Sequence, residues 1–222
     1  MKRNIYLLVA IAFISLSAIS CKDKTNKAET SEAKEVVEAS ENASLYNADA
    51  TKSVIHWTGS KPAGKHTGTL HLFSGSIAVV NRDVQSGEFV INMNSLTNTD
   101  MDGDGKASLE SHLKGLEDDS KKDFFNVTDY PTAKFELTNV TGEGGKVMVN
   151  GNLTIKNITQ NIEFPATVSF PGDTMFLKSD SFTIDRTKWG VNFMSKTIFS
   201  DLKDKFIDDD IELTIELHAN KA

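Results

Sequence analysis

The stretch Ile211-Glu212-Leu213-Thr214-Ile215-Glu216-Leu217-His218-Ala219 alternates apolar and polar side chains at every second residue. Successive side chains of a β-strand point to opposite faces, so this pattern predicts a strand with one buried and one solvated face. The same period of two recurs in upstream segments, namely 54–60, 66–73, 76–80, 89–93, 133–138, 147–155, 162–170 and 175–184. The chain from residue 53 onward is therefore expected to consist mainly of strands.

Turn-forming residues separate these segments, as in Asn81-Arg82-Asp83, Asn157-Ile158-Thr159 and Pro171-Gly172-Asp173. Many strands joined by short polar turns predict an antiparallel up-and-down meander. About eight strands can close on themselves and so remove their exposed edges. We therefore predict an all-β fold, an antiparallel barrel of about eight strands.

Two segments depart from the alternation. Leu109, His112, Leu113 and Leu116 fall at helical spacing, which predicts one short helix over Ala107 to Leu116, with Ser108 near its start as a cap. Asp185 to Lys205 carries aromatic side chains without steady alternation. Long connections inside compact domains are often functional, so we expect this segment to form a lid or rim.

The N-terminus has the features of an export signal, because Lys2 and Arg3 precede an apolar run that ends in small residues before Cys21. The run is too short to remain as a membrane-spanning helix. We predict a signal peptide over 1–20 and a lipidated cysteine at Cys21, since Ser17 to Cys21 resembles a bacterial lipobox in which Ala18 stands where Leu is usual. The alternative is an ordinary signal peptide with a nearby cleavage site.

The chain after Cys21 divides into a polar linker and one domain. Residues 22 to about 44 contain almost no large apolar side chain, so 21–44 is predicted to be a flexible tether. Residues 45–222 are long enough for one domain with a substantial core. Removing Lys2 and Arg3 with the signal would change the net charge from −7 to −9, which argues against a nucleic-acid partner.

The folded part resembles the YceI-like family over nearly its whole length. The resemblance rests on segments that occur in the right order, namely Ser53–Gly59, His66–Thr69, Ser74–Ser76, Leu109–Lys114, Asp123–Phe125, Tyr130–Phe135, Val149–Lys156, Ile184–Gly190 and Ile207–Ile211. It implies an extended, lipocalin-like barrel, periplasmic or secreted, whose interior holds a polyisoprenoid or another long-chain amphiphile. The acidic stretch Asp100 to Lys106 stands as an insertion beside the predicted helix, so the entrance to the barrel there can differ from the family pattern.

The strand pattern agrees with that implication. A strand from Gln160 to Phe170 spans roughly 36 Å at about 3.3 Å per residue, so the barrel can be a deep sleeve with an apolar inward face. The side chains expected to line the ligand site are Trp57, Phe89, Ile91, Phe135, Val149, Leu153, Phe164, Trp189 and Phe193. The two tryptophans have packing in an ordinary core as an equally good alternative.

A polar head group would remain near the end of the barrel. Arg186, His66 and His112 are the candidates to meet it through charge-assisted hydrogen bonds. Their structural alternatives are that Arg186 pairs with Asp185 or Asp209 to hold the rim, and that the histidines satisfy backbone carbonyls.

Metal and cofactor chemistry finds little support in the sequence. Asp100-Met101-Asp102-Gly103-Asp104-Gly105 resembles the start of a calcium loop, but Ser111 stands at the twelfth position where Glu is expected. His66 and His71 lie five apart and would face opposite sides of a strand, which does not suit zinc. No nucleophile elbow is present. We therefore predict no metal, no cofactor and no catalytic residue.

The functional prediction is a non-enzymatic protein of the bacterial cell envelope, in the periplasm or on the outer membrane, that binds or carries a long apolar ligand and is anchored through Cys21. Two alternatives stay open: a solid barrel that contacts another envelope protein, and an enzyme acting on lipids or sugars. The sequence leaves the oligomeric state open, with a homodimer as one option.

Overall fold

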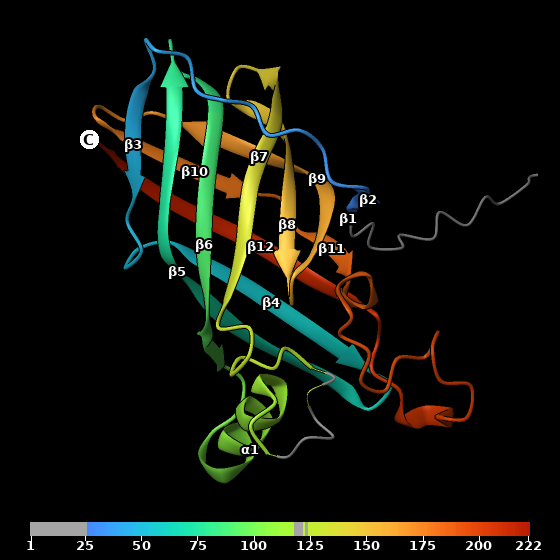
Figure 1. Cartoon of the computed structure of the whole chain (residues 1–222). Helices are drawn as coiled ribbons and strands as arrows, with labels where there is room; N and C mark the ends of the chain where they lie inside the picture. Colours follow the sequence, from blue (N-terminus) through green and yellow to red (C-terminus); the bar gives the residue numbers. More distant parts are fainter. Residues whose placement is uncertain (1–25, 118–121, 123) are drawn as a thin grey trace, which may run out of the picture.

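The strands of this computed structural model, which describes residues 26–117, 122 and 124–222, form one sheet that closes into a ring (Figure 1). Around the ring each strand pairs with its neighbours in antiparallel register, and the last strand pairs back to the first. In order these strands are β4 (Val54–Lys61), β5 (Gly64–Val80), β6 (Asp83–Asn98), β7 (Thr132–Glu143), β8 (Lys146–Ile155), β9 (Ile158–Ser169), β10 (Thr174–Ser179) and β12 (Asp210–Lys221). The predicted antiparallel barrel of about eight strands is confirmed.

The final strand closes the ring because it is long enough to pair on both sides along its length. Its first half lies between β4 and β11 (Phe182–Asp185), and its second half lies between β10 and β3 (Ser44–Ala48). The segment that alternates most clearly in the sequence is thus the strand on which closure depends.

The inward face follows the period of two read from the sequence. On β12 the residues Leu213 and Leu217 face the interior, while Glu216 on the other face pairs with Lys178 at 2.7 Å. The same holds on β9, where Ile162 and Phe164 are each 2% exposed. One hydrophobic core therefore runs through the inside of the ring.

The two longest strands, β5 and β6, are continuous and contain bulges. We expected separate strands over 66–73 and 76–80, but β5 runs through both, and its register with β6 shifts next to Thr69, Leu72 and Ala78. Bulges let a long strand curve around a barrel, which explains the continuity. Asn81 and Arg82 both have positive φ between β5 and β6, as a two-residue hairpin turn requires.

The predicted helix is present with an earlier start. α1 spans Gly103–Lys114, with Asp102 as its N-cap and Gly115 in the left-handed conformation at its C-terminal end. The prediction of 107–116 was late at the start because the first turn is polar and exposed, so it adds nothing to the apolar spacing. Among the residues that the structure describes, no helix is long and apolar enough to cross a membrane.

The predicted rim segment, residues 185–205, lies between β11 and β12 at the same end of the ring as α1 (Figure 1). It contains two short 3₁₀ helices, Arg186–Trp189 and Lys203–Lys205. Its base is closed by a bridge between Ser195, which is fully buried, and Ile207. The segment is thus anchored at its base, with Ile198 and Phe199 exposed toward its tip.

The N-terminal part of the described chain runs along the outside of the sheet. β1 (Asn26–Lys27) pairs with β11, and β2 (Glu29–Ser31) pairs with β9. Further along, the side-chain amide of Asn152 exchanges two hydrogen bonds with the backbone of Lys34. We expected a flexible tether here, and the structure instead holds part of it by backbone and amide hydrogen bonds, which composition does not reveal. The predicted signal peptide and Cys21 lie outside the described residues.

Candidate ligand-binding cavity

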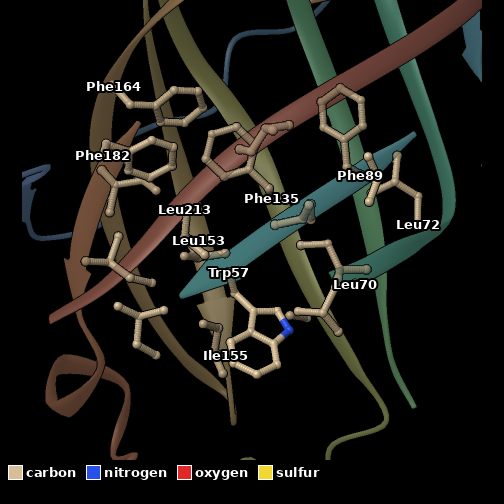
Figure 2. A pocket seen from close by; sticks show the side chains of 18 of the residues that line it. Trp57, Leu70, Leu72, Phe89, Phe135, Leu153, Ile155, Phe164, Phe182 and Leu213 are labelled. Atoms are coloured by element: carbon tan, nitrogen blue, oxygen red, sulfur yellow. The ribbon is translucent and has the colours of Figure 1, made fainter. Parts of the chain in front are cut away.

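The ring of strands encloses one continuous apolar cavity with a volume of about 200 Å³ (Figure 2). Its wall takes inward side chains from every strand of the ring, from β11 and from α1. The labelled side chains in Figure 2 are Trp57, Leu70, Leu72, Phe89, Phe135, Leu153, Ile155, Phe164, Phe182 and Leu213. For scale, an apolar protein cavity of about 150 Å³ accommodates benzene. The barrel is therefore hollow, and its own side chains do not meet at the axis.

Aromatic rings occupy one side of this wall. Phe135 lies between Phe89 and Phe164, with ring centroids at 6.5 Å and 5.9 Å. Phe164 in turn stacks on the fully buried Phe182 at 4.5 Å, with the two rings almost parallel. Gly151 on β8 leaves room for Phe135, because a Cβ at position 151 would lie 2.2 Å from the ring. This side of the wall is thus built from packed aromatic rings.

Apart from the indole of Trp57, the polar side chains of the residues that border the cavity already have partners. Ser53 donates to and accepts from the backbone of His218. The carboxylate of Asp208 pairs with Lys196 at 2.5 Å, and that of Glu216 pairs with Lys178. These groups are not available to solvate a charge inside the cavity, so the interior suits hydrocarbon.

Arg186 is held by the protein itself rather than left free for a head group. Its guanidinium donates to the carbonyls of Val191, Phe193, Ile207 and Asp208 over 2.6 to 3.1 Å, and it lies 3.7 Å from the Asp209 carboxylate. Burial lowers the pKa of Arg186, and the nearby carboxylates oppose that shift. Arg186 thus connects the first turn of the rim segment to its far end. This agrees with the alternative in which Arg186 holds the rim instead of meeting a head group.

Most of the predicted ligand residues lie on the cavity wall. These are Trp57, Phe89, Ile91, Phe135, Val149, Leu153, Phe164, Arg186 and Trp189. Contact with a ligand remains a prediction for each of them. Sequence reasoning missed Phe182, Phe124 and Phe125, although the last two belong to a segment that carries the family resemblance.

His66, His112 and Phe193 lie off the wall. His112 contacts Phe124 and Phe193 edge to face at 4.9 and 4.8 Å, and Phe193 stacks on Phe124 at 4.9 Å. Phe124 itself lines the cavity, so the other two rings stand behind it. We expected His112 and Phe193 to contact the ligand, but Phe124 occupies the wall there, and the sequence pattern does not reveal this.

His66 belongs to a polar cluster at the α1 end. Its Nδ1 lies 2.9 Å from the carboxylate of Asp100, which also accepts from the backbone N–H of Thr67 and the side chain of Asn98. The Thr67 hydrogen bond, followed by those from His66 and Asn98, lowers the pKa of Asp100 to about 2. Asp100 thus joins β5 to the end of β6, and this use accounts for the first residue of the calcium-like string.

Two solved structures share this fold over most of the chain. BcnA from Burkholderia cenocepacia is 22% identical, with a TM-score of 0.61 over 78% of this chain and 99% of that protein. A polyisoprenoid binding domain from Saccharophagus degradans, implicated in plant cell wall breakdown, is 14% identical, with a TM-score of 0.56 over 80% of this chain and 98% of that one. At these identities the likeness concerns the fold alone.

Curated relatives match over shorter stretches. A UPF0312 protein of Photorhabdus laumondii is 39% identical over 56 residues, which is 25% of this chain and 26% of that protein. Protein YceI of Salmonella arizonae is 27% identical over 106 residues, 48% of this chain and 50% of that protein. The chain therefore spans about half the length of these relatives or less.

The strands of the ring, α1 and the cavity fall almost entirely within one domain match. The YceI-like domain matches residues 46–219, which run from β3 almost to the end of β12 and include the wall of the cavity. The chain belongs to the YceI-like domain family.

Proposed function

We propose that this protein binds one long-chain apolar ligand, a polyisoprenoid or a similar amphiphile, inside the ring of strands. The observation that carries the proposal is the continuous cavity whose wall is almost entirely carbon and whose charged side chains already have partners. A solid barrel that serves only as an interaction module would have no such hollow. The fold shared with a domain described as polyisoprenoid binding supports the same ligand class.

The size of the hydrophobic contribution decides which ligands bind. Burying a methylene contributes about 0.8 kcal/mol, so about twelve contribute on the order of 10 kcal/mol. Association costs roughly 4 to 15 kcal/mol in lost freedom. A long chain can therefore offset the cost of association, and a short one cannot, so affinity should rise with chain length. The empty cavity of about 200 Å³ is only slightly larger than one that holds benzene, so the wall must move apart to bury such a chain.

We infer that the protein acts without chemical turnover. General acid–base catalysis needs a titratable group within reach of the reacting atoms. Of the ionisable side chains described along the wall, Arg186 is saturated by carbonyls, and Asp208 and Glu216 are paired with lysines. Carrying or storing a ligand does not require a free titratable group.

The location that we propose is the bacterial cell envelope, with Cys21 lipidated and the barrel held near a membrane. The lipobox-like sequence before Cys21 supports this, together with the polar linker that follows it. The rim segment would move to admit the ligand, because it is the long irregular connection at the α1 end of the ring.

Extraction of the folded, purified protein with organic solvent, followed by mass spectrometry, tests the proposal. We expect one class of long-chain apolar compound in an amount close to that of the protein. Absence of any such compound, combined with no uptake of a fluorescent fatty acid by the extracted and refolded protein, would contradict it. Uptake without a co-purified compound would still support binding, because a ligand can be lost during purification.

A further inference from the structure

The two tryptophans on the cavity wall differ in how their indole N–H groups are used. Trp189 is fully buried, and its Nε1 donates to the carbonyl of Leu153 at 2.9 Å. Trp57 is 8% exposed, and its Nε1 has no hydrogen-bond partner. Buried N–H groups are nearly always paired, so the unpaired one calls for an explanation.

This unpaired donor belongs to the cavity. In the described part of the chain, the other buried polar side-chain atoms without a hydrogen bond are oxygens of Asn126, Asn192 and Asp209, none of which belongs to a residue on the wall. An acceptor for Trp57 would therefore have to come from whatever fills the hollow.

Packing fixes the indole of Trp57 in the wall. Trp57 on β4 lies opposite Gly68 on β5, and a Cβ at position 68 would lie 2.3 Å from Cζ2 and 2.4 Å from Cε2 of the indole. The six-membered ring therefore occupies the space that the glycine leaves. Figure 2 shows Nε1 on the side of Leu70, the next inward residue on β5. Because the nitrogen is covered when the cavity is empty, a side chain beside it has to change its rotamer before a ligand can reach it.

The charge of the wall restricts what the acceptor can be. Within the described wall the cation is Arg186, which already serves four carbonyl groups. An anionic oxygen buried near Trp57 would lack a free counter-charge, and its desolvation would go unopposed. A neutral oxygen needs only the one hydrogen bond that the indole offers.

We propose that Trp57 Nε1 donates a hydrogen bond to a neutral oxygen of the ligand, a carbonyl, ether or hydroxyl group. This inference rests on the proposed binding function and narrows its ligand class, because it favours an oxygen-bearing chain over a plain hydrocarbon. The acceptor then lies within the barrel, beside β4 and β5, and an anionic group on the same ligand stays outside.

The test compares hexadecane with the methyl ketone of the same chain length, using the whole protein and its Trp57→Phe variant. The chain contains two tryptophans, so ¹⁵N-labelled protein gives two indole signals. We expect the ketone to move the Trp57 indole proton downfield and hexadecane to move it less, with the Trp189 signal unchanged in both cases. The affinity for the ketone divided by the affinity for hexadecane should be about 2- to 10-fold lower in Trp57→Phe than in the wild-type protein, which is the range for one hydrogen bond. Comparing this ratio between the two proteins cancels the difference in water solubility between the two ligands.

The outcomes separate this inference from the binding function. Equal responses of the Trp57 signal to both ligands, or an unchanged ratio in a folded variant, would overturn the hydrogen bond while leaving apolar binding intact. If neither ligand bound to the wild-type protein, the binding function itself would fail. The indole measurement uses the wild-type chain, so it decides the question even if Trp57→Phe folds poorly.

Discussion

Replacing Ala133 with leucine should stabilise this protein and weaken ligand binding at the same time. Ala133 lies on β7 opposite Ile91, is 4% exposed, and lines the cavity. Leucine adds three carbons that would project into the hollow. At about 0.8 kcal/mol for each, they contribute roughly 2.4 kcal/mol, from which about 0.5 to 1 kcal/mol of side-chain entropy is lost. The expected gain is about 1 to 2 kcal/mol, or roughly 2 to 8 °C in Tm for a domain of this size.

The same three carbons would displace part of the ligand. If the ligand loses contacts worth roughly 2.4 kcal/mol, its affinity falls about 60-fold. Urea denaturation measures the first effect, and titration with a fluorescent fatty acid measures the second. The matched control is Ala166→Leu, because Ala166 is also 4% exposed and in the core but does not line the cavity. That change should cost about 1 to 3 kcal/mol through overpacking.

The two substitutions are expected to change the free energy of unfolding in opposite directions, which makes the comparison decisive. If Ala133→Leu destabilised the protein as much as Ala166→Leu does, the wall at Ala133 would be packed and the reasoning would be refuted. An unchanged affinity in a stabilised variant would place the ligand elsewhere.

Three further predictions concern the rim, the α1 end and the N-terminus. Arg186→Lys should lower the free energy of unfolding by about 2 to 4 kcal/mol, because an ammonium cannot donate to four carbonyls at once. Limited proteolysis of this variant should then cut first within the rim segment. An unchanged proteolysis pattern would mean that Arg186 does not hold the rim. Asp100→Asn should lose less than about 1 kcal/mol near neutral pH, since the site is partly exposed. The native pKa of Asp100 is lowered to about 2 from 3.8, so the carboxylate stabilises the fold above about pH 4 and this contribution disappears as the pH falls toward 2. Urea midpoints of both proteins should therefore converge over that interval, and a gap that widened there would contradict the assignment. Cys21→Ser should move the protein from the membrane to the soluble fraction of cells, and a variant that stayed membrane-bound would count against a lipid anchor at Cys21.

Much of the fold could be predicted because alternation reports burial directly. The apolar positions of β8, β9 and β12 face the interior as the period of two requires, and their order along the chain gives the meander. What alternation could not give was the merging of two segments into β5, because a bulge shifts the register without a clear mark in the composition. The early start of α1 was missed for a related reason, since a polar first turn carries no apolar signal.

The candidate site was predictable where inward strand positions lie well inside the ring. Phe135, Val149 and Phe164 are of this kind, and all three line the cavity. Residues near the ends of the strands were harder to place, because their surroundings depend on how α1 and the rim segment pack. His66 turns to Asp100 for this reason, and His112 stands behind Phe124. No sequence pattern predicts the unpaired N–H of Trp57, because it can be recognised only when the neighbours of the indole are known.

Binding inside the ring can be tested by intermolecular nuclear Overhauser effects between the methylenes of a long-chain ligand and the methyl groups of the protein, which show where the bound chain lies. We expect contacts to inward methyls such as those of Leu153, Ile155 and Leu213, with none to Leu45, which is 48% exposed outside the cavity. Contacts confined to exposed methyls, in a complex of measured affinity, would show that the ligand binds the surface and that the hollow does not hold it.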